Sequence, residues 1–160
     1  MQSKVFEVTV RNMHSVEIPA EIAIPFAEAG EKRVRIEARF EGQSVDFHAA
    51  LQRRGDRYFV MFGKSHQKTL GIFPNDYFSF QLFKDTTKYG VEVPEELEAV
   101  LMSDYEAFQN FEAFTPGRKR GIIYMIARYK TSQTRIDKSL LLCENLKRGI
   151  KDPALLLKSF

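Results

Sequence analysis

Apolar and polar residues alternate along much of the first half of the chain, with the period of two that half-buried β-strands show. The stretch from Arg33 to Phe40 is the clearest case, since its apolar residues alternate with arginine and glutamate. The pattern predicts strands over residues 4–11, 15–18, 33–40, 45–53, 57–62 and 77–84. Helical turns between Pro19 and Gly30 and from Lys64 to Leu70 separate pairs of these strands.

The order strand, short helix, loop, strand occurs twice in this half. A shift of 44 positions aligns apolar residues with one another: Ile18 with Phe62, Phe26 with Leu70, Val34 with Phe78 and Ile36 with Phe80. The connections that follow residues 40 and 53 are short and contain glycine, as hairpins require. Short strands, tight turns and two similar halves favour a small closed or partly closed β-barrel.

The second half changes to the period of helices. Polar residues 86–90 mark a boundary, so we expect an α+β chain with a β domain over residues 1–88 and a helical domain over residues 91–160. A helix is expected to start at Val93-Pro94, and the capping-box spacing from Ser103 to Glu106 opens another. The aromatic residues of that second helix follow one helix face, which favours a role in the core over a stacking platform. They are Tyr105, Phe108 and Phe111.

Two further helices are predicted between Thr115 and Gly149. The first begins at the cap Thr115, with Pro116 in the first helical position. Its apolar face comprises Ile122, Met125, Ile126 and Tyr129, and the opposite stripe comprises Arg120, Tyr124 and Arg128. The second begins near Thr131 and Ser132 and ends at Gly149. Its expected buried face comprises Ile136, Leu140, Cys143 and Leu146. With a last short helix from Asp152, the domain has three to four helices.

The net charge of +3 conceals a strong segregation. Residues 91–114 carry seven acids and no base, whereas residues 115–160 carry 11 bases and three acids. Such asymmetry indicates either a polyanion partner or an acidic helix pair that packs beside a basic one. Charge runs usually form solvated or mutually neutralising faces, so internal pairing is the simpler interpretation.

The candidate binding surface is the basic outer face of the last two long helices, whose residues folding does not obviously require. Its members are Arg118, Arg120, Tyr124, Arg128, Lys130, Thr134, Arg135 and Lys138. They predict a protein or other anionic partner. The alternative is nucleic acid, because a tyrosine between arginines combines backbone neutralisation with base stacking. A small anionic ligand between the two domains is a third possibility, which no motif supports.

No constellation of catalytic or metal-binding residues is apparent. His14, His48 and His66 are scattered through the β domain, and no nucleophile elbow, phosphate-binding glycine loop or zinc-ligand spacing occurs. Cys143 lies on a predicted core face, where a buried thiol is inert. We therefore expect no enzymatic activity, no cofactor and no metal.

Residues 122–127 form the longest apolar run, far shorter than the ~20 residues that a membrane span requires. The first residues contain no apolar signal core, and a single cysteine excludes an internal disulfide. We expect a cytoplasmic protein without a membrane span. The sequence does not indicate an oligomeric state.

The segment HQKTLGIFPNDYFSFQL, residues 66–82, resembles the helix–glycine–loop–aspartate–strand unit of double-split β-barrels, the architecture of AbrB/MazE-like proteins. The first ninety residues as a whole are similar to a double-split barrel domain of unknown function in bacteria and archaea. That family usually shows Gly-Asp where this chain has Asn75-Asp76, and asparagine tolerates positive φ, so the turn should be kept. AbrB-like relatives bind DNA with their barrels. The mixed charge of the strand exteriors here does not favour that use.

The sequence from residue 93 to residue 149 resembles the YdeI/OmpD-associated family, which is associated by name with bacteriocin protection and with an outer-membrane porin. The resemblance rests on a Val-Pro-Glu start, an aromatic helix, the Thr115-Pro116 step with its basic cluster, and then Lys130, Thr134, Arg135 and Lys138. The chain departs from the family pattern at Gly117, Gly121 and Asp137. The resemblance implies a stress-protection or interaction role and names no ligand.

Overall fold

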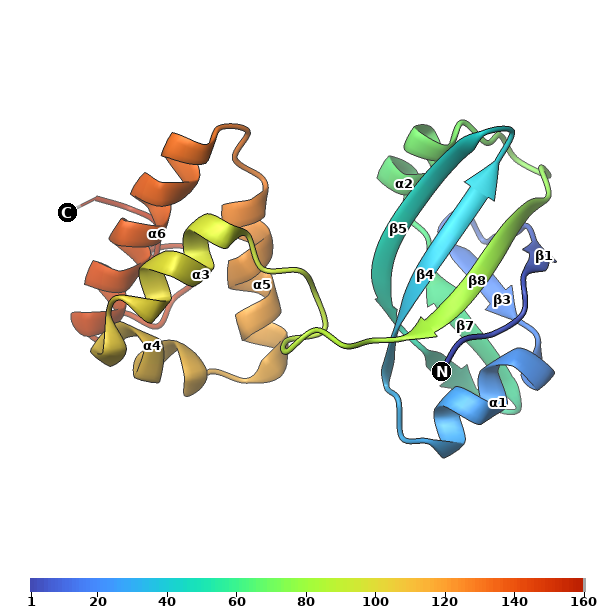
Figure 1. Ribbon diagram of the computed structural model, residues 1–160, viewed down its shortest axis with the longest axis horizontal. Helices are drawn as coiled ribbons and strands as arrows, with labels where there is room; N and C mark the ends of the chain where they lie inside the picture. Colours follow the sequence, from blue (N-terminus) through green and yellow to red (C-terminus); the bar gives the residue numbers. More distant parts are fainter. Residues whose placement is uncertain (160) are drawn as a thin grey trace. The chain divides into compact units, whose positions relative to one another are not determined.

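The computed structural model describes residues 1–159 and divides into two compact units, Met1–Gly90 and Val91–Phe160. Figure 1 shows the strands in the first unit and most of the helices in the second. Over the described residues there are eight strands in two antiparallel sheets and six helices, four of which follow the last strand. The predicted α+β class is confirmed.

The first unit is built from two four-stranded sheets. One has the order β1 (Phe6–Val8), β8 (Phe78–Lys84), β4 (Arg33–Phe40) and β5 (Gln43–Ala50). The other has the order β2 (Val10–Arg11), β3 (Ser15–Ile18), β7 (Arg57–Met61) and β6 (Gln52–Arg54). Two short helices complete the unit, α1 (Ala20–Glu28) and α2 (Lys64–Leu70).

The two similar halves predicted from the sequence lie side by side in both sheets. Strand β3 pairs with β7 in one sheet, and β4 pairs with β8 in the other. All eight residues matched by the 44-residue shift are buried in one core. Phenylalanine rings dominate that core: the rings of Phe62 and Phe80 lie 5.5 Å apart at their centroids, and both side chains are fully buried.

Two predicted strands are each divided by the structure. The alternating stretch over residues 4–11 breaks at Thr9, so that β1 joins one sheet and β2 the other. The stretch over residues 45–53 breaks in the same way at Leu51, whose backbone N–H donates to the carbonyl of Lys32 at 2.9 Å. The chain therefore passes from one sheet to the other at both points. The predicted turn after α2 is confirmed, with Asn75 at φ 72° and the Asp76 carboxylate accepting from the N–H of Phe73.

The second unit contains α3 (Glu95–Met102), α4 (Tyr105–Glu112), α5 (Pro116–Ala127) and α6 (Ser132–Lys147). The caps form as the sequence indicates for α5 and α6: the hydroxyls of Thr115 and Thr131 accept the N–H groups of Arg118 and Thr134. Helix α4 is capped by Asp104 instead of Ser103. Residues 1–159 contain no helix long and apolar enough to cross a lipid bilayer.

The core of this unit forms where α3 and α4 pack on α6. Ile122 and Ile126 of α5 are buried, as predicted, whereas the buried face of α6 differs from the prediction. It consists of Ser139, Leu142, Cys143, Asn145 and Leu146, while Leu140 is 51% exposed. The aromatic stripe of α4 is divided as well, with Phe111 buried and Tyr105 exposed.

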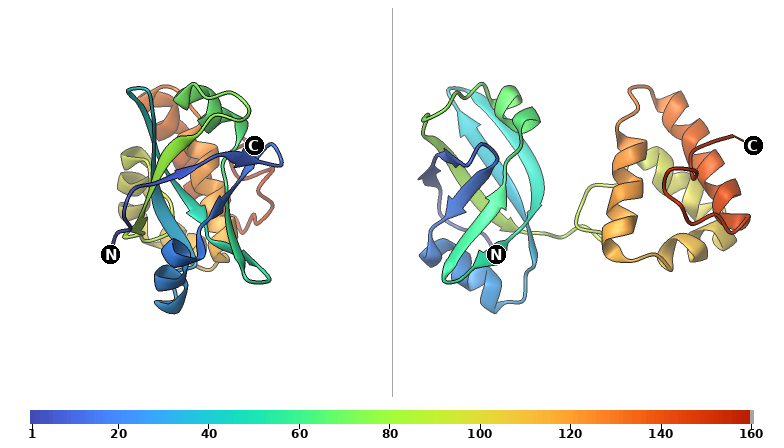
Figure 2. Two further views of the ribbon diagram at one scale, coloured as in Figure 1. Left: turned by 90° about the vertical axis from the view of Figure 1, so that its right-hand side faces the viewer. Right: turned by 180° about the vertical axis from the view of Figure 1, so that it is seen from behind.

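The chain after Gly149 forms turns and no helix through Ser159, so the short helix expected from Asp152 is wrong. The segment instead loops back beside α6, as Figure 2 shows. The buried amide of Asn145 donates to the carbonyls of Leu155, Leu156 and Lys158 at 3.3, 2.9 and 2.9 Å. This anchoring buries Leu156 completely, so a leucine of the returning segment closes the core.

Candidate binding site on the helical unit

Among the described residues, three ion pairs join the acidic helices to basic side chains of the same unit. Arg135 of α6 lies 3.0 Å from the carboxylate of Glu96 on α3, and Lys147 of α6 lies 2.7 Å from that of Asp104 at the start of α4. Lys119 of α5 lies 3.5 Å from the carboxylate of Glu112 at the end of α4. Internal pairing therefore accounts for part of the charge segregation, and two of the three cations come from α6.

Arg135 holds the unit together. One guanidinium nitrogen donates to the Glu96 carboxylate and the other to the carbonyl of Tyr129 at 2.8 Å, which ties α3 to the turn between α5 and α6. The guanidinium lowers the pKa of Glu96 to about 2, aided by the carboxyl's own backbone N–H and by the hydroxyl of Ser132. Of the eight residues proposed for the binding face, Arg135 is thus one that folding does require.

Thr134 also has a structural partner. It lies in the first turn of α6, where its hydroxyl is 2.7 Å from that of the cap Thr131 and its N–H donates to the same oxygen at 3.1 Å. The pair satisfies donors that a helix start leaves without intrahelical partners. Thr134 is therefore part of the cap.

The stripe on α5 points away from the buried face of that helix. Tyr124 is 47% exposed, Arg128 is exposed and Arg120 is half-buried, and Lys130 is exposed in the turn that follows. Within residues 1–159 the side chains of Arg120, Arg128 and Lys130 form no ion pair and no hydrogen bond. We call Arg120, Tyr124, Arg128 and Lys130 the α5 stripe.

A groove of about 510 Å³ lies beside the α5 stripe. Its walls are the end of α5, one residue of α6 and the returning C-terminal segment. They comprise Met125, Arg128, Tyr129, Lys138, Pro153, Ala154, Leu157 and Lys158. The Nζ of Lys138 donates to the carbonyl of Leu157 at 3.3 Å and lies 5.6 Å from the centre of the Tyr129 ring. The groove thus brings together two of the proposed residues, Arg128 and Lys138, and none of its described lining residues carries a side-chain carboxylate.

Arg118 lies in a different place. It lines a second groove, of about 410 Å³, together with Phe114 and Lys151. Its guanidinium is 3.5 Å from the carbonyl of Lys151 and 5.8 Å from the centre of the Phe114 ring. The eight proposed residues therefore do not form one continuous set. Arg118 lies apart from the rest, and Thr134 and Arg135 support the fold. The other five form the α5 stripe or line the groove beside it.

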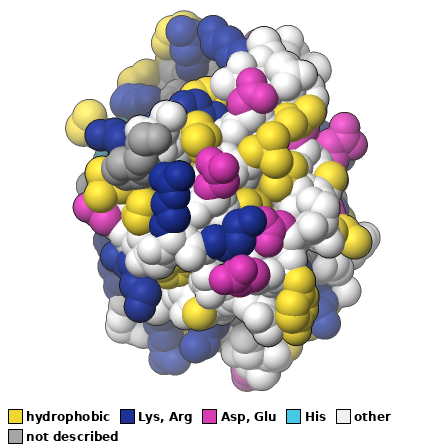
Figure 3. All heavy atoms as spheres, turned by 90° about the vertical axis from the view of Figure 1, so that its left-hand side faces the viewer, with side chains coloured by type: hydrophobic (Ala, Val, Ile, Leu, Met, Phe, Trp, Pro, Cys, Tyr) yellow, Lys and Arg dark blue, Asp and Glu magenta, His cyan; other side chains and the backbone are white. Residues whose placement is uncertain are grey.

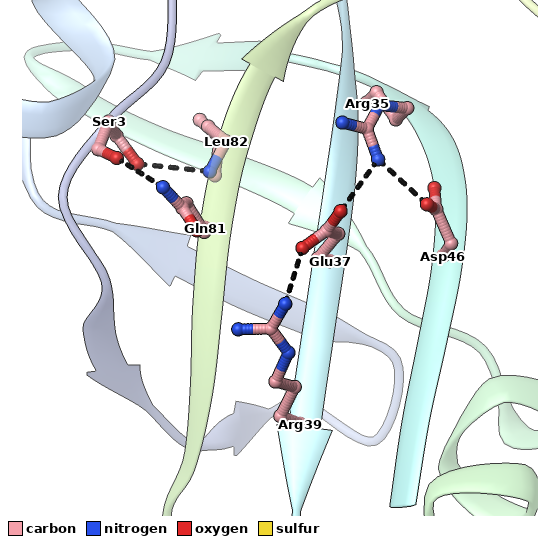
Figure 4. Close-up of polar contacts among 7 residues, drawn as sticks. All are labelled: Ser3, Arg35, Glu37, Arg39, Asp46, Gln81 and Leu82. Carbon is pink, nitrogen blue, oxygen red and sulfur yellow. Dashed lines mark hydrogen bonds and ion pairs between the residues drawn. The ribbon is translucent and has the colours of Figure 1, made fainter.

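Elsewhere opposite charges are interspersed. Figure 3 views the molecule from the side of the helical unit, where Lys and Arg side chains are intermixed with Asp and Glu side chains. On the exterior of the first sheet, Arg35 lies 3.0 Å from Glu37 and 2.7 Å from Asp46, and Arg39 lies 2.8 Å from Glu37 (Figure 4). The mixed charge predicted for the strand exteriors is present there as direct ion pairs.

The groups best suited to catalysis are engaged in packing. The imidazole of His66 stacks on the rings of Phe47 and Phe62, with centroids 4.6 and 5.8 Å away, and burial lowers its pKa. Burial raises the pKa of Cys143 to about 11, so the thiol stays protonated near neutral pH. Residues 1–159 contain no group of three or more His, Cys, Asp or Glu side chains placed to hold a metal ion.

Sequence reasoning missed two features of the site. Asn145 anchors the C-terminal segment, and Leu157 and Lys158 of that segment line the groove. A signal was available in the three leucines that follow the Gly149 helix stop, because such a run needs a surface to pack on. An asparagine among leucines near the end of α6 was a second signal, since buried amides are found where backbone groups need partners.

Comparisons with known proteins agree with the helical half of this description. Residues 90–149 match the model of a family described as bacteriocin-protection, YdeI or OmpD-associated, so the resemblance predicted for that half is confirmed. No curated protein matches the chain. Among solved structures, the solution structure of PHS018 from Pyrococcus horikoshii is similar at 23% identity and a TM-score of 0.42. The similarity covers 50% of this chain and 88% of that one.

Proposed function

We propose that the protein is a non-enzymatic interaction module of the bacteriocin-protection type, which binds an acidic partner protein through the α5 stripe. One observation carries the proposal: Arg120, Arg128 and Lys130 are left unpaired among residues 1–159, although a neighbouring segment carries seven acids. A fold that needed these cations for internal neutrality would have paired them, as it pairs Arg135 with Glu96.

The composition of the stripe supports a protein partner. Arginine and tyrosine are enriched among residues that contribute most to protein–protein binding, because both combine a large contact area with directional hydrogen bonding. Tyr124 lies between Arg120 and Arg128 on the same helix face. An acidic partner is favoured because unpaired cations gain from opposite charge, both in encounter rate and in specificity. The family match over residues 90–149 agrees with this role at the level of the family.

The absence of an enzymatic activity is part of the proposal. It is supported by His66 and Cys143, whose reactive groups are buried in packing contacts. His48 is also largely enclosed, 3.7 Å from the carboxylate of Asp85. We further propose a cytoplasmic setting, since one buried free cysteine suits a reducing compartment.

For the first unit we propose a double-split barrel that serves as a scaffold. The strand pairing supports it: each half contributes one strand to each sheet beside its counterpart, and the chain crosses between sheets at Thr9 and Leu51. The ion-paired exterior of β4 and β5 favours a scaffold over a DNA-binding surface, which needs unneutralised cations for phosphates.

The test is affinity capture with the full chain, followed by mass spectrometry of cross-linked partners. We expect Arg120→Glu with Arg128→Glu to lose an acidic partner that the wild type retains, and salt to weaken the wild-type complex. The control is Arg39→Glu with Arg54→Glu, which makes the same change of charge on the first unit. Identical partners for wild type and the α5 variant would overturn the proposal. Salt-sensitive binding of mixed DNA or RNA, lost in the same variant, would replace it with the nucleic-acid alternative.

A further inference from the structure

The groove beside the α5 stripe combines an apolar wall with cationic side chains. Its apolar wall is formed by Met125 of α5 and by Pro153 and Leu157 of the C-terminal segment, with the Tyr129 ring between them. Three cations line the same space, and none of the lining residues carries a carboxylate. The volume of about 510 Å³ falls in the range of roughly 300–1,000 Å³ that small-molecule sites occupy.

The three cations differ in how far they are already engaged. The Nζ of Lys138 donates to the carbonyl of Leu157 and lies over Tyr129, so it has a fixed position with donors to spare. Arg128 and Lys158 have no ion pair and no side-chain hydrogen bond within residues 1–159. An anion held here would meet one positioned ammonium and two cations without a partner among residues 1–159.

From this arrangement we infer that the groove binds a small amphipathic anion, an organic carboxylate with a hydrocarbon or aromatic body. The carboxylate lies among Arg128, Lys138 and Lys158, where the planar guanidinium matches its two oxygens. The apolar body lies on Met125, Leu157 and Tyr129, and the unbranched methionine side chain adapts to bodies of different shape. A purely inorganic anion would leave the apolar wall in water.

The inference goes beyond the proposed function, because it concerns a small molecule and not a partner protein. The two rest on different side chains except for Arg128. Lys158 and Leu157 line the groove and lie outside the α5 stripe, whereas Arg120 and Tyr124 belong to the stripe and do not line the groove. Failure of one is therefore distinguishable from failure of the other.

The experiment is a titration of the ¹⁵N-labelled full chain with decanoate, in which binding is monitored through the amide chemical shifts. We expect saturable shifts confined to residues around Tyr129, Lys138 and 153–158, with a dissociation constant on the order of 1 mM or lower for a ligand of this size. Decanol lacks the charge and acetate lacks the apolar body, so each should bind at least about tenfold more weakly.

Two variants complete the test. Arg128→Gln with Lys158→Gln removes the two unpaired cations and keeps the Lys138 contact with Leu157, and should weaken decanoate binding about tenfold or more. Arg120→Gln with Lys130→Gln, a matched loss of two charges outside the groove, should leave the affinity unchanged. Decanoate shifts that are absent, spread over both units, matched by decanol or unaffected by the double variant would each overturn the inference. If the Arg120 and Arg128 charge reversals abolish partner capture but decanoate does not bind, the proposed function is supported and the inference about the groove is wrong.

Discussion

The two units neutralise their charges in different ways. In the first, the ion pairs on the sheet exteriors lie within one strand or between paired strands: Arg35 and Arg39 both contact Glu37 along β4, Arg35 also contacts Asp46 on β5, and Arg57 on β7 contacts Glu17 on β3. In the second, the pairs join separate helices, and Arg135 reaches Glu96 across 39 residues of sequence. In a sheet, the strand register places oppositely charged residues next to one another. In the helical unit, the packing of the helices determines which cations lie close enough to a carboxylate to form an ion pair.

This difference explains why unpaired cations collect on α5. Helix α6 packs on both acidic helices and supplies Arg135 and Lys147 to them. Helix α5 contributes Lys119 at its start, and within residues 1–159 Arg120 and Arg128 of its outward stripe form no ion pair. The unpaired cations of the α5 stripe are thus a consequence of the order in which the helices pack.

The largest expected effect concerns the aromatic core of the first unit. Phe80 is fully buried and contacts the rings of Phe6, Phe47, Phe62 and Phe78. Phe80→Ala should lower the free energy of unfolding of this unit by about 3–5 kcal/mol, because a large cavity replaces the ring. Residue-resolved hydrogen exchange on the full chain measures it, since the helical unit should keep its protection.

Phe73→Ala is the matched control, because Phe73 is 76% exposed. It should change the stability of the first unit by no more than about 0.5 kcal/mol. Equal losses in the two variants would show that the phenylalanine cluster does not determine the stability of this unit.

The next effect concerns the polar anchor of the helical unit. Asn145→Ala leaves the carbonyls of Leu155, Leu156 and Lys158 without their donor, at a cost of about 1–3 kcal/mol. Urea denaturation measures the loss, and amide exchange should show that residues 155–158 lose protection before α6 does. The exposed neighbour Glu144→Ala is the control, and retained protection of the segment in the Asn145 variant would contradict the anchoring role.

The ion pair between Arg135 of α6 and Glu96 of α3 should make the stability of the helical unit sensitive to acid. Arg135 holds the pKa of Glu96 at about 2, below its ordinary 4.5, so the folded state binds the proton less readily than the unfolded state. The stability from this pair is therefore complete above about pH 4.5 and is lost as the pH falls toward 2. Glu96→Gln should flatten that part of the pH–stability curve measured by urea denaturation. The exposed Glu98→Gln is the control, and a curve unchanged by Glu96→Gln would exclude the pair as the cause.

Most of the first unit could be predicted because alternation reports directly which side of a strand is buried. What the alternation could not show is the exchange of sheets at Thr9 and Leu51, since inward and outward positions continue without interruption across both points. The same limit applies to the barrel type, which depends on strand pairing over long sequence separations.

The candidate site was harder to predict, because charge partners in helical proteins are set by packing. Nothing local to Arg135 indicates that it meets Glu96, and so it was counted with the outward residues. On α6, Leu140 was placed in the core in preference to Ser139, because hydrophobicity alone ranks the leucine higher. The buried hydroxyl of Ser139 is satisfied by the carbonyl of Arg135, a local hydrogen bond that lets a serine occupy the core face.

The smallest expected effect is a difference between the two units in how their stability depends on pH near neutrality, because all three histidines lie in the first unit. His66 stacks on Phe47 and Phe62, and burial lowers its pKa below the ordinary 6.5. The unfolded chain therefore takes up the proton first, so the first unit should lose stability as the pH falls from 7 to 5, while the helical unit should not. His66→Phe keeps the stacked ring and removes the titration, so it should abolish most of this loss in residue-resolved hydrogen exchange. His14→Gln removes a histidine that is not stacked in the core and serves as the control: if it flattened the curve as much as His66→Phe, the stacked imidazole would not be the group responsible.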